Sequence, residues 1–379
     1  MMRDAVLKLI HSVHGKDLND LFNDLAKRIF QYQFEHNRPY RQFCLLQNKS
    51  PDQINRWEEI PALPVTAFKF VDLACQPMEK ALRIFHSSGT TRGQHALRGG
   101  QGKWSRHAVF DLEIAQAAIL SHFKRHVLNR EARLAGAVPP LREEKIGLYI
   151  LTPSPKEAPH SSLSYMMEVV REAYGTEEGN YYIHRGRLLA DKLLYDLSQA
   201  EKPVVLIGTS FSFVHFIDFL MERPETILLP PGSKMMDTGG FKGKSRTVSS
   251  HWLYAMIEKR LGIPVAYCCN EYGMAEMTSQ FYDGIAGIPH LRVYHAPPQT
   301  RWQILSPFTL KPVKKGDVGL LAIYDLANID SVSAILTEDL AKEVTEGNAP
   351  CEGTGFELTG RATGAEIKGC SVDIDTLLG

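Results

Sequence analysis

The chain lacks the features that mark several large classes of protein. Its 379 residues include six cysteines and no C-x-x-C pair, which predicts neither a zinc ribbon nor a disulfide framework and favours a reducing cytoplasm. Lys plus Arg and Asp plus Glu both number 43, so the basic excess typical of nucleic-acid-binding proteins is missing. No run of about eighteen uncharged apolar residues occurs, so no membrane span is predicted. The N-terminal segment also has no signal-peptide pattern.

What is present is the composition of a globular protein. Hydrophobic residues make up 44% of the chain and charged residues 23%, enough for a large buried core. In the first eighty residues, apolar side chains recur at helical spacing from Leu18 to Ile29, which predicts a mainly helical N-terminal part. We interpret this stripe as core packing.

From about residue 82, short apolar runs alternate with helical patterns. Strands are predicted at 146–151, 204–207, 226–229 and 264–267, and helices at 105–128, 162–174, 187–199 and 248–261. This alternation predicts an α/β fold with mostly parallel sheets. Later strands at 318–326 and 354–360 predict a smaller β-rich part.

The most distinctive local feature is a loop rich in glycine and hydroxyl side chains, Ser87-Ser88-Gly89-Thr90-Thr91-Arg92-Gly93. Glycine lets backbone amides surround an anion, and hydroxyls and Arg92 supply further donors. The loop therefore indicates phosphate binding, while a polar turn between two elements is the structural alternative. A second stretch, Thr238–Ser245, ends like a Walker A loop but has threonine at the first glycine position, so no P-loop hydrolase is predicted.

Four stretches, in chain order, resemble the motifs of the adenylate-forming superfamily, which includes the acyl- and aryl-CoA synthetases. They are the loop at 87–93, Asn270–Glu276, Leu336–Asp339 and Gly360–Gly364. Within this superfamily, the same Ser-Ser-Gly-Thr-Thr loop and three further stretches resemble the LuxE-type acyl-protein synthetases: Ile60–Lys69, Thr238–Lys242 and Glu366–Ser371. The resemblance extends from about residue 60 to the end of the chain.

This resemblance implies that ATP and Mg²⁺ are cofactors and that a carboxylic acid is activated as acyl-AMP. Glu276 is implied as the magnesium ligand, since a hard cation takes oxygen ligands, and as a catalytic residue together with Arg361. Tyr272 is implied beside the adenine, and Asp339 as the acceptor of the ribose hydroxyls. The implied nucleotide-binding residues are Ser87, Ser88, Gly89, Thr90, Thr91, Arg92, Gly93, Gly239, Gly240, Asn270, Glu271, Tyr272, Gly273, Asp339 and Arg361.

The sequence departs from the superfamily pattern at two places. The usual lysine after the phosphate-binding loop is replaced by the segment Gln94–Arg98, so Arg92 or Arg98 is the alternative basic group. Only eighteen residues follow Arg361. We therefore expect a large domain over 1–359, a hinge and short tail over 360–379, and a C-terminal lid domain that is absent or reduced to a stub.

A different acyl acceptor is then needed, and Cys370 occupies the position that resembles the acylated cysteine of LuxE-type proteins. Lys368 would favour its thiolate, whereas a small apolar filler is the structural alternative. The resemblance implies a fatty-acid–protein ligase that passes its acyl group to an acyl reductase. Coenzyme A or a carrier-protein thiol as acceptor, and a non-catalytic nucleotide-binding relative, stay open. For the acid's channel, Gly208–Phe213 is the candidate lining, with core packing as the alternative.

Overall fold

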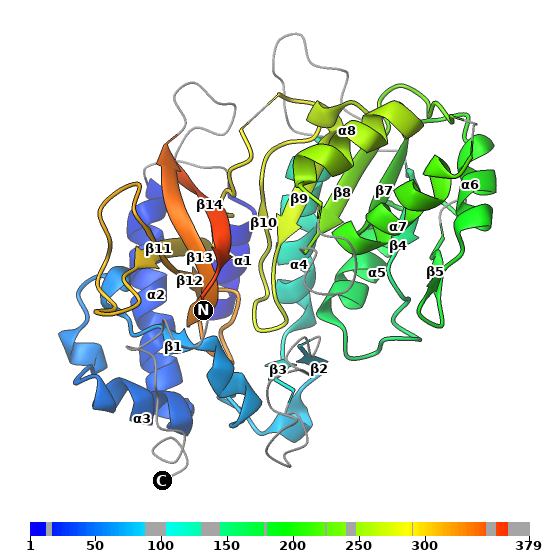
Figure 1. The fold of residues 1–379 in the computed structure, drawn as a ribbon. Helices are drawn as coiled ribbons and strands as arrows, with labels where there is room; N and C mark the ends of the chain where they lie inside the picture. Colours follow the sequence, from blue (N-terminus) through cyan, green and yellow to red (C-terminus); the bar gives the residue numbers. More distant parts are fainter. Residues whose placement is uncertain are drawn as a thin grey trace, which may run out of the picture.

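The computed structural model describes residues 1–12, 17–87, 104–129, 145–177, 180–223, 226–239, 248–289, 291–345 and 354–362. Within these ranges the chain forms two lobes that lie side by side, each built around a five-stranded sheet (Figure 1). Several positions predicted to be functional, Ser88 to Gly93, Gly240 and Cys370, lie outside the described residues.

The α/β lobe contains a sheet with the strand order β10-β9-β8-β7-β4. Its strands are β4 (Gly147–Leu151), β7 (Val204–Thr209), β8 (Lys234–Thr238), β9 (Cys268–Tyr272) and β10 (Phe281–Tyr282). The first four are parallel, and β10 is antiparallel to β9. Successive β8 residues, Met235 and Met236, pack into apolar clusters on opposite faces, as strands buried on both faces do. The predicted α/β fold with mostly parallel strands is confirmed.

Helices cover both faces of this sheet. One face carries α4 (Leu112–Phe123), its π-helical extension η6 (Lys124–Leu128) and α5 (Ser162–Tyr174). The other carries α6 (Ala190–Ser198), α7 (Ser210–Met221) and α8 (Ser250–Leu261). Four of these helices start at a side chain that accepts a hydrogen bond from a backbone N–H of the first turn; these N-caps are Asp111, Ser161, Thr209 and Ser249.

The second lobe is the β-rich part. Its strands are β1 (Leu63–Pro64), β11 (Thr300–Leu305), β12 (Val318–Asp325), β13 (Ala334–Thr345) and β14 (Thr354–Arg361). The order is β1-β13-β12-β11, with β14 also paired to β13, and only the β1–β13 pair is parallel. Three helices pack against this sheet: α1 (Met2–Ile10), α2 (Asp17–His36) and α3 (Arg38–Leu46). Short 3₁₀ turns connect them to β2 (Arg83–His86), which forms a hairpin with β3 (Arg106–Val109).

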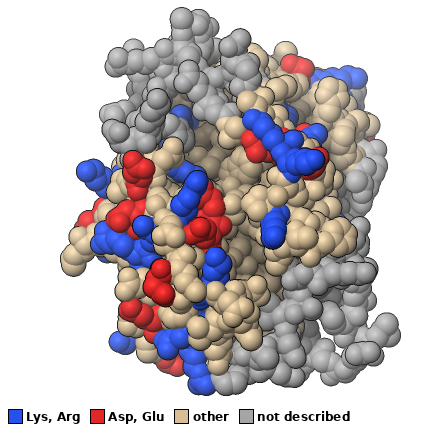
Figure 2. All heavy atoms as spheres, turned by 90° about the vertical axis from the view of Figure 1, so that its left-hand side faces the viewer, with Lys and Arg blue, Asp and Glu red and all other residues tan. Residues whose placement is uncertain are grey.

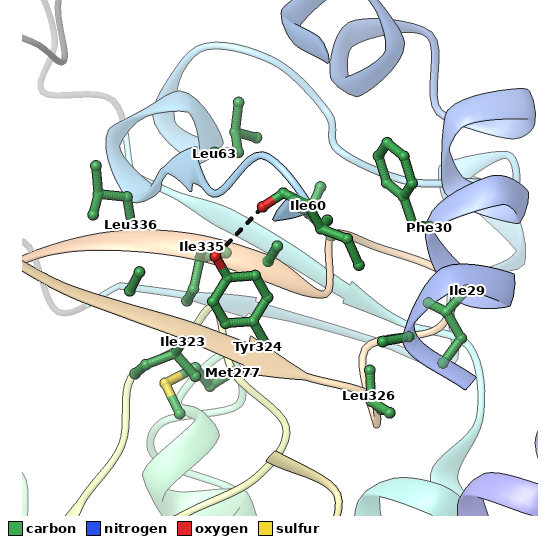
Figure 3. Packing of buried hydrophobic residues seen from close by; sticks show 14 of the residues in the cluster. Ile29, Phe30, Ile60, Leu63, Met277, Ile323, Tyr324, Leu326, Ile335 and Leu336 are labelled. Atoms are coloured by element: carbon green, nitrogen blue, oxygen red, sulfur yellow. Dashed lines mark hydrogen bonds between the residues drawn. The ribbon is translucent and has the colours of Figure 1, made fainter. Parts of the chain in front are cut away.

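The core of this lobe joins the N-terminal helices to strands from the end of the chain. Ile29 and Phe30 of α2 belong to the same buried cluster as Ile323 of β12 and Ile335 of β13, and Figure 3 shows Ile29 beside Leu326, which directly follows β12. The Tyr324 hydroxyl donates a hydrogen bond to the backbone oxygen of Ile60, at 3.4 Å. The helical stripe predicted from the sequence is thus buried core, as expected.

Two of the predicted strands are wrong. Residues 226–229 form no strand, because the amides of Ile227 and Leu229 donate to the carbonyl oxygens that end α8, at 3.2 and 2.9 Å. The strand is β8 instead, where the buried Lys234 interrupts the apolar run. The run 264–267 is largely the 3₁₀ helix η7 (Val265–Tyr267), and β9 begins after it.

Two predicted helices begin too early. The segment 105–128 opens with strand β3, and 187–199 opens with β6 (Arg187–Leu188), which pairs with β5 (Ile183–His184). Strands β11 and β13 were not predicted. All of these missed strands are stabilised by hydrogen bonds to a partner strand. Local sequence propensity does not reveal such pairing.

Charged side chains of both signs are interspersed on the face of the β-rich lobe (Figure 2). Ion pairs connect neighbouring strands there, including Lys342–Glu357 at 2.9 Å. This distribution matches the balanced composition. Within the described residues, no helix is both long and apolar enough to cross a membrane.

Candidate active site

A cavity of about 1330 Å³ lies where the two lobes meet, lined by residues of β9, β13 and β14 and by the ends of several helices. The carboxyl ends of the parallel strands β7, β8 and β9 open into it, as is usual for ligand sites in open α/β sheets. Every described residue of the predicted site lines this cavity: Ser87, Gly239, Asn270, Glu271, Tyr272, Gly273, Glu276, Asp339 and Arg361. The fold therefore brings together motifs that are far apart in the sequence.

Glu276 lies in the turn after β9 and is only 5% exposed. Its carboxylate accepts a hydrogen bond from the Ser105 hydroxyl, and its backbone oxygen accepts one from Nδ2 of Asn328 at 3.0 Å. Burial raises the pKa of Glu276, an effect that Ser105 and the nearby charges of Lys69 and Arg361 partly offset. Among the described residues, no Lys or Arg forms an ion pair with it. The arrangement suits a cation ligand, because a buried carboxylate that forms no direct ion pair favours one.

Ser105 was not predicted from the sequence. It precedes β3, and its hydroxyl connects the hairpin to Glu276, 171 residues further along the chain. The Ser105 amide donates to the Ser87 hydroxyl, and the Ser87 amide donates to the Ser105 carbonyl oxygen, both at 3.3 Å. One residue thus joins the start of the predicted phosphate-binding loop to the carboxylate. No local pattern marks such a residue, because the contact exists only in the folded chain.

Tyr272, Asp339 and Arg361 lie together at the edge of the β-rich lobe. The Tyr272 hydroxyl donates to Oδ2 of Asp339 at 2.9 Å. The pKa of Tyr272 is raised well above its ordinary value, mainly by burial and secondly by the negative charge of Asp339. Asp339 pairs directly with Arg361 in the β13–β14 register, and the Arg361 guanidinium forms an ion pair with Glu338. The aromatic, the carboxylate and the cation predicted to hold a nucleotide thus share one wall.

Asn270 and Glu271 are neighbours on β9 whose side chains point to opposite faces, as alternate residues of a strand do. Oδ1 of Asn270 accepts from the Tyr294 hydroxyl at 2.6 Å, and the Tyr294 ring lies 5.7 Å from that of Tyr272. The Glu271 carboxylate accepts from the Thr238 hydroxyl on the other face. Asn270 and Tyr272 therefore face one part of the cavity, and Glu271 faces another.

Two buried carboxyl groups line the cavity with unusual proton affinity. Burial raises the pKa of Glu271 to about 7 and that of Asp237 to about 6. Asp237 accepts hydrogen bonds from Ser210 at 2.5 Å and from Tyr254 at 2.6 Å, which oppose this effect. Asp237 was not predicted as a site residue, although it directly precedes the Thr-Gly-Gly stretch at 238–240.

The pKa of Glu271 leads to a testable effect on stability. The folded protein retains the Glu271 proton up to about pH 7, whereas a free glutamate loses it near 4.5. The free energy of unfolding therefore falls as the pH rises from 4.5 to about 7 and stays low above that. Glu271→Gln carries no ionisable group, so it should be more stable than the wild type by up to about 3 kcal/mol at pH 8 and nearly equal to it at pH 4.5. Urea unfolding at both values measures this difference. An equal difference at both would contradict it.

The candidate acid-channel segment is divided by the structure. Thr209, Ser210 and Phe211 line the cavity, whereas Phe213 is fully buried in the core cluster between α7 and the sheet. Core packing is thus confirmed for Phe213, and the acid channel stays a prediction for the three residues that face the cavity.

A comparison with known proteins agrees with the motifs. The family model "Acyl-protein synthetase, LuxE" matches residues 133–378. The long-chain-fatty-acid–luciferin-component ligase of Aliivibrio fischeri is 23% identical over 379 residues, covering 96% of this chain and 90% of that protein. The ligase of the same name from Vibrio harveyi is 21% identical over 374 residues, covering 95% and 88%.

Solved structures confirm the fold. A 2-hydroxyisobutyryl-CoA ligase in complex with 2-HIB-AMP and CoA superposes with a TM-score of 0.64 at 16% identity, covering 93% of this chain and 70% of that one. An open conformation of this ligase gives 0.63 over 90% and 69%. The predicted fold class and the predicted resemblance are both confirmed. The chain belongs to the LuxE family of acyl-protein synthetases and is a ligase with the adenylate-forming fold.

Proposed function

We propose that the protein activates a carboxylic acid, of the fatty acid class named in its bacterial relatives, with ATP and transfers the acyl group to its own Cys370. A carboxylate oxygen of the acid attacks the α-phosphorus, the bond to the β-phosphate breaks, and pyrophosphate leaves. The cysteine sulfur then attacks the acyl carbon, AMP leaves with the carboxylate-derived oxygen, and the thiol proton is released. The product is a thioester.

The observation that carries this proposal is the buried Glu276 carboxylate in a cavity shared with the other motif residues. Glu276 would hold Mg²⁺, which when bound neutralises charge on the phosphates. Asp339 would accept hydrogen bonds from the ribose, Tyr272 would lie against the adenine, and Arg361 would approach the phosphate. Ser87 and the following glycine-hydroxyl loop, with Gly239, would donate to phosphate oxygens.

The acceptor role of Cys370 is supported by the state of the other thiols. Burial raises the pKa of Cys44, Cys75, Cys268 and Cys269 far above that of a free cysteine. A thiol that stays protonated is a poor nucleophile. Of the six cysteines, these four are therefore unsuited to accept an acyl group.

The acylated protein would deliver its acyl group to a partner, by analogy with its family an acyl reductase, in the cytoplasm. A thioester keeps the acyl carbon reactive toward a hydride or a second thiol.

The test is ATP–pyrophosphate exchange with a panel of carboxylic acids, followed by intact-mass measurement. Exchange that depends on the acid, together with an acyl mass adduct released by hydroxylamine, is the expected result. Exchange without an adduct would move the acceptor to coenzyme A or a carrier-protein thiol. Thermal stabilisation by MgATP without exchange would instead indicate a protein that only binds the nucleotide.

A further inference from the structure

Two buried acceptor oxygens face the cavity from the start of the predicted nucleotide motif. Glu271 is 4% exposed, and Thr238 is its one hydrogen-bond partner among the described residues. Gln280 is 7% exposed; its Nε2 donates to the backbone oxygen of Thr278 at 2.8 Å, while its Oε1 has no partner within the described ranges. Both residues line the cavity. Such oxygens are rarely left without a donor in folded proteins.

The two side chains flank one point, beside Gly273. Tyr272 pairs with Phe281 in the antiparallel β9–β10 register, so Gly273 and Gln280 lie opposite each other just past the paired residues. A Cβ built on Gly273 would collide with Oε1 of Glu271 and lie 3.9 Å from Cγ of Gln280. Glycine at this position therefore leaves Oε1 of Glu271 uncovered. Any larger residue would occupy the space that this oxygen faces.

This point is separate from the wall assigned to the nucleotide. Asn270 and Tyr272 face Tyr294, whereas Glu271 is on the opposite face of β9. The same cavity is also lined by apolar side chains of α4 and α5, namely Ala115, Ile119 and Met166. If the nucleotide lies on the Tyr272 wall, as the proposed function has it, the remaining volume holds the acid. That volume has both an apolar side and a pair of hydrogen-bond acceptors.

We infer that the acid activated by this protein is an aliphatic hydroxy acid, whose single hydroxyl proton is donated to one of this pair of oxygens, Oε1 of Glu271 or Oε1 of Gln280, while its hydrocarbon part packs on α4 and α5. An unsubstituted chain would supply no donor to Oε1 of Glu271 or to Oε1 of Gln280, and sites built to bind a hydroxyl discriminate strongly against analogues that lack it. Burial keeps the pKa of Glu271 near 7, so a neutral hydroxyl suits this carboxyl better than an ammonium group does. This inference rests on the proposed function and narrows its substrate class.

The experiment measures kcat/KM for acid-dependent pyrophosphate exchange with aliphatic acids of one chain length. One acid is unsubstituted, and the others carry a hydroxyl group at successive carbons from the carboxyl group; the matching amino acids form a second series. At least one hydroxy acid should exceed the unsubstituted acid about tenfold or more. Equal or better use of the unsubstituted acid, or preference for an amino acid, would overturn the inference.

Variants show whether the two side chains produce this preference. Glu271→Leu and Gln280→Leu should each bring the ratio of kcat/KM for the hydroxy acid to kcat/KM for the unsubstituted acid toward one. Glu271→Gln keeps an acceptor oxygen and should retain most of the preference for the hydroxy acid. A merely structural role would lower both rates together and leave the ratio unchanged, which would count against the inference. Should a leucine variant fail to fold, the wild-type panel and Glu271→Gln still decide. If none of the acids supports pyrophosphate exchange, the proposed function itself is overturned. That result is distinct from exchange that occurs without a preference for the hydroxy acid.

Discussion

Replacing Cys370 with alanine is expected to abolish the acyl adduct on the protein while acid-dependent pyrophosphate exchange continues. Exchange reports the formation and reversal of the acyl adenylate, which precedes attack by the thiol. The variant should therefore form and release acyl-AMP but show no added acyl mass after incubation with MgATP and the acid. The effect is all or none, because a covalent bond to sulfur cannot form without the sulfur.

The matched control is Cys75→Ala. Cys75 is half-buried, and Sγ lies 3.8–3.9 Å from the backbone oxygens of Ile329 and Ser331. Burial raises the pKa of its thiol, so the residue should not compete as a nucleophile at neutral pH. Cys75→Ala should carry the same hydroxylamine-sensitive adduct as the wild type. An adduct that persists in Cys370→Ala would refute the assignment and direct attention to Cys351.

The fold could be predicted from the sequence to the extent that its elements are locally encoded. Helix α5 has the predicted bounds, 162–174, and the N-cap Ser161 marks its start. Strand β8 was missed because the buried Lys234 breaks its apolar run; Nζ donates to the backbone oxygen of Leu128 at 2.8 Å, a contact that no local pattern announces. The apolar run 226–229 predicted a strand in its place, but the amides of this run donate to carbonyl oxygens at the end of α8.

The site could be predicted where ordered motifs carry it, and not where its support comes from tertiary contacts. Asn270, Tyr272 and Asp339 were placed by motif order, and the structure brings them to one cavity. Ser105 and Gln280 have no recognisable motif, and each acquires a role only through packing against the strand end at β9. The side chain of Glu271 shows a further limit, since its place in a motif does not reveal that it points away from Asn270.

Glu276→Gln should lower acid-dependent pyrophosphate exchange about a hundredfold or more, because a neutral amide is a far weaker cation ligand than a carboxylate. The same variant should not lose stability. Burial raises the pKa of Glu276, so its charge opposes folding at neutral pH, and an uncharged side chain of the same shape removes that cost. The melting temperature should therefore stay equal or rise while activity falls.

Ser105→Ala provides the graded comparison. It removes the hydroxyl that donates to the Glu276 carboxylate and leaves the carboxylate itself in place. Hydrogen bonds to charged groups contribute roughly 1.5–3 kcal/mol, so exchange should fall about tenfold to a hundredfold, less than in Glu276→Gln. If Glu276 acts through a bound cation, the loss in Ser105→Ala should be partly recovered at higher Mg²⁺ concentration, since the ligand is displaced and not absent.

The pairing of rate and melting temperature separates function from packing. A buried carboxylate kept for structure alone would be stabilising, and its removal would lower the melting temperature and the exchange rate together. A carboxylate kept for chemistry is held at a cost to the fold, as groups at active sites often are. Unchanged exchange in Glu276→Gln would remove the central residue of the proposed mechanism. Lost exchange at an unchanged or higher melting temperature, with Ser105→Ala between it and the wild type, would place the reaction at the carboxylate that Ser105 holds.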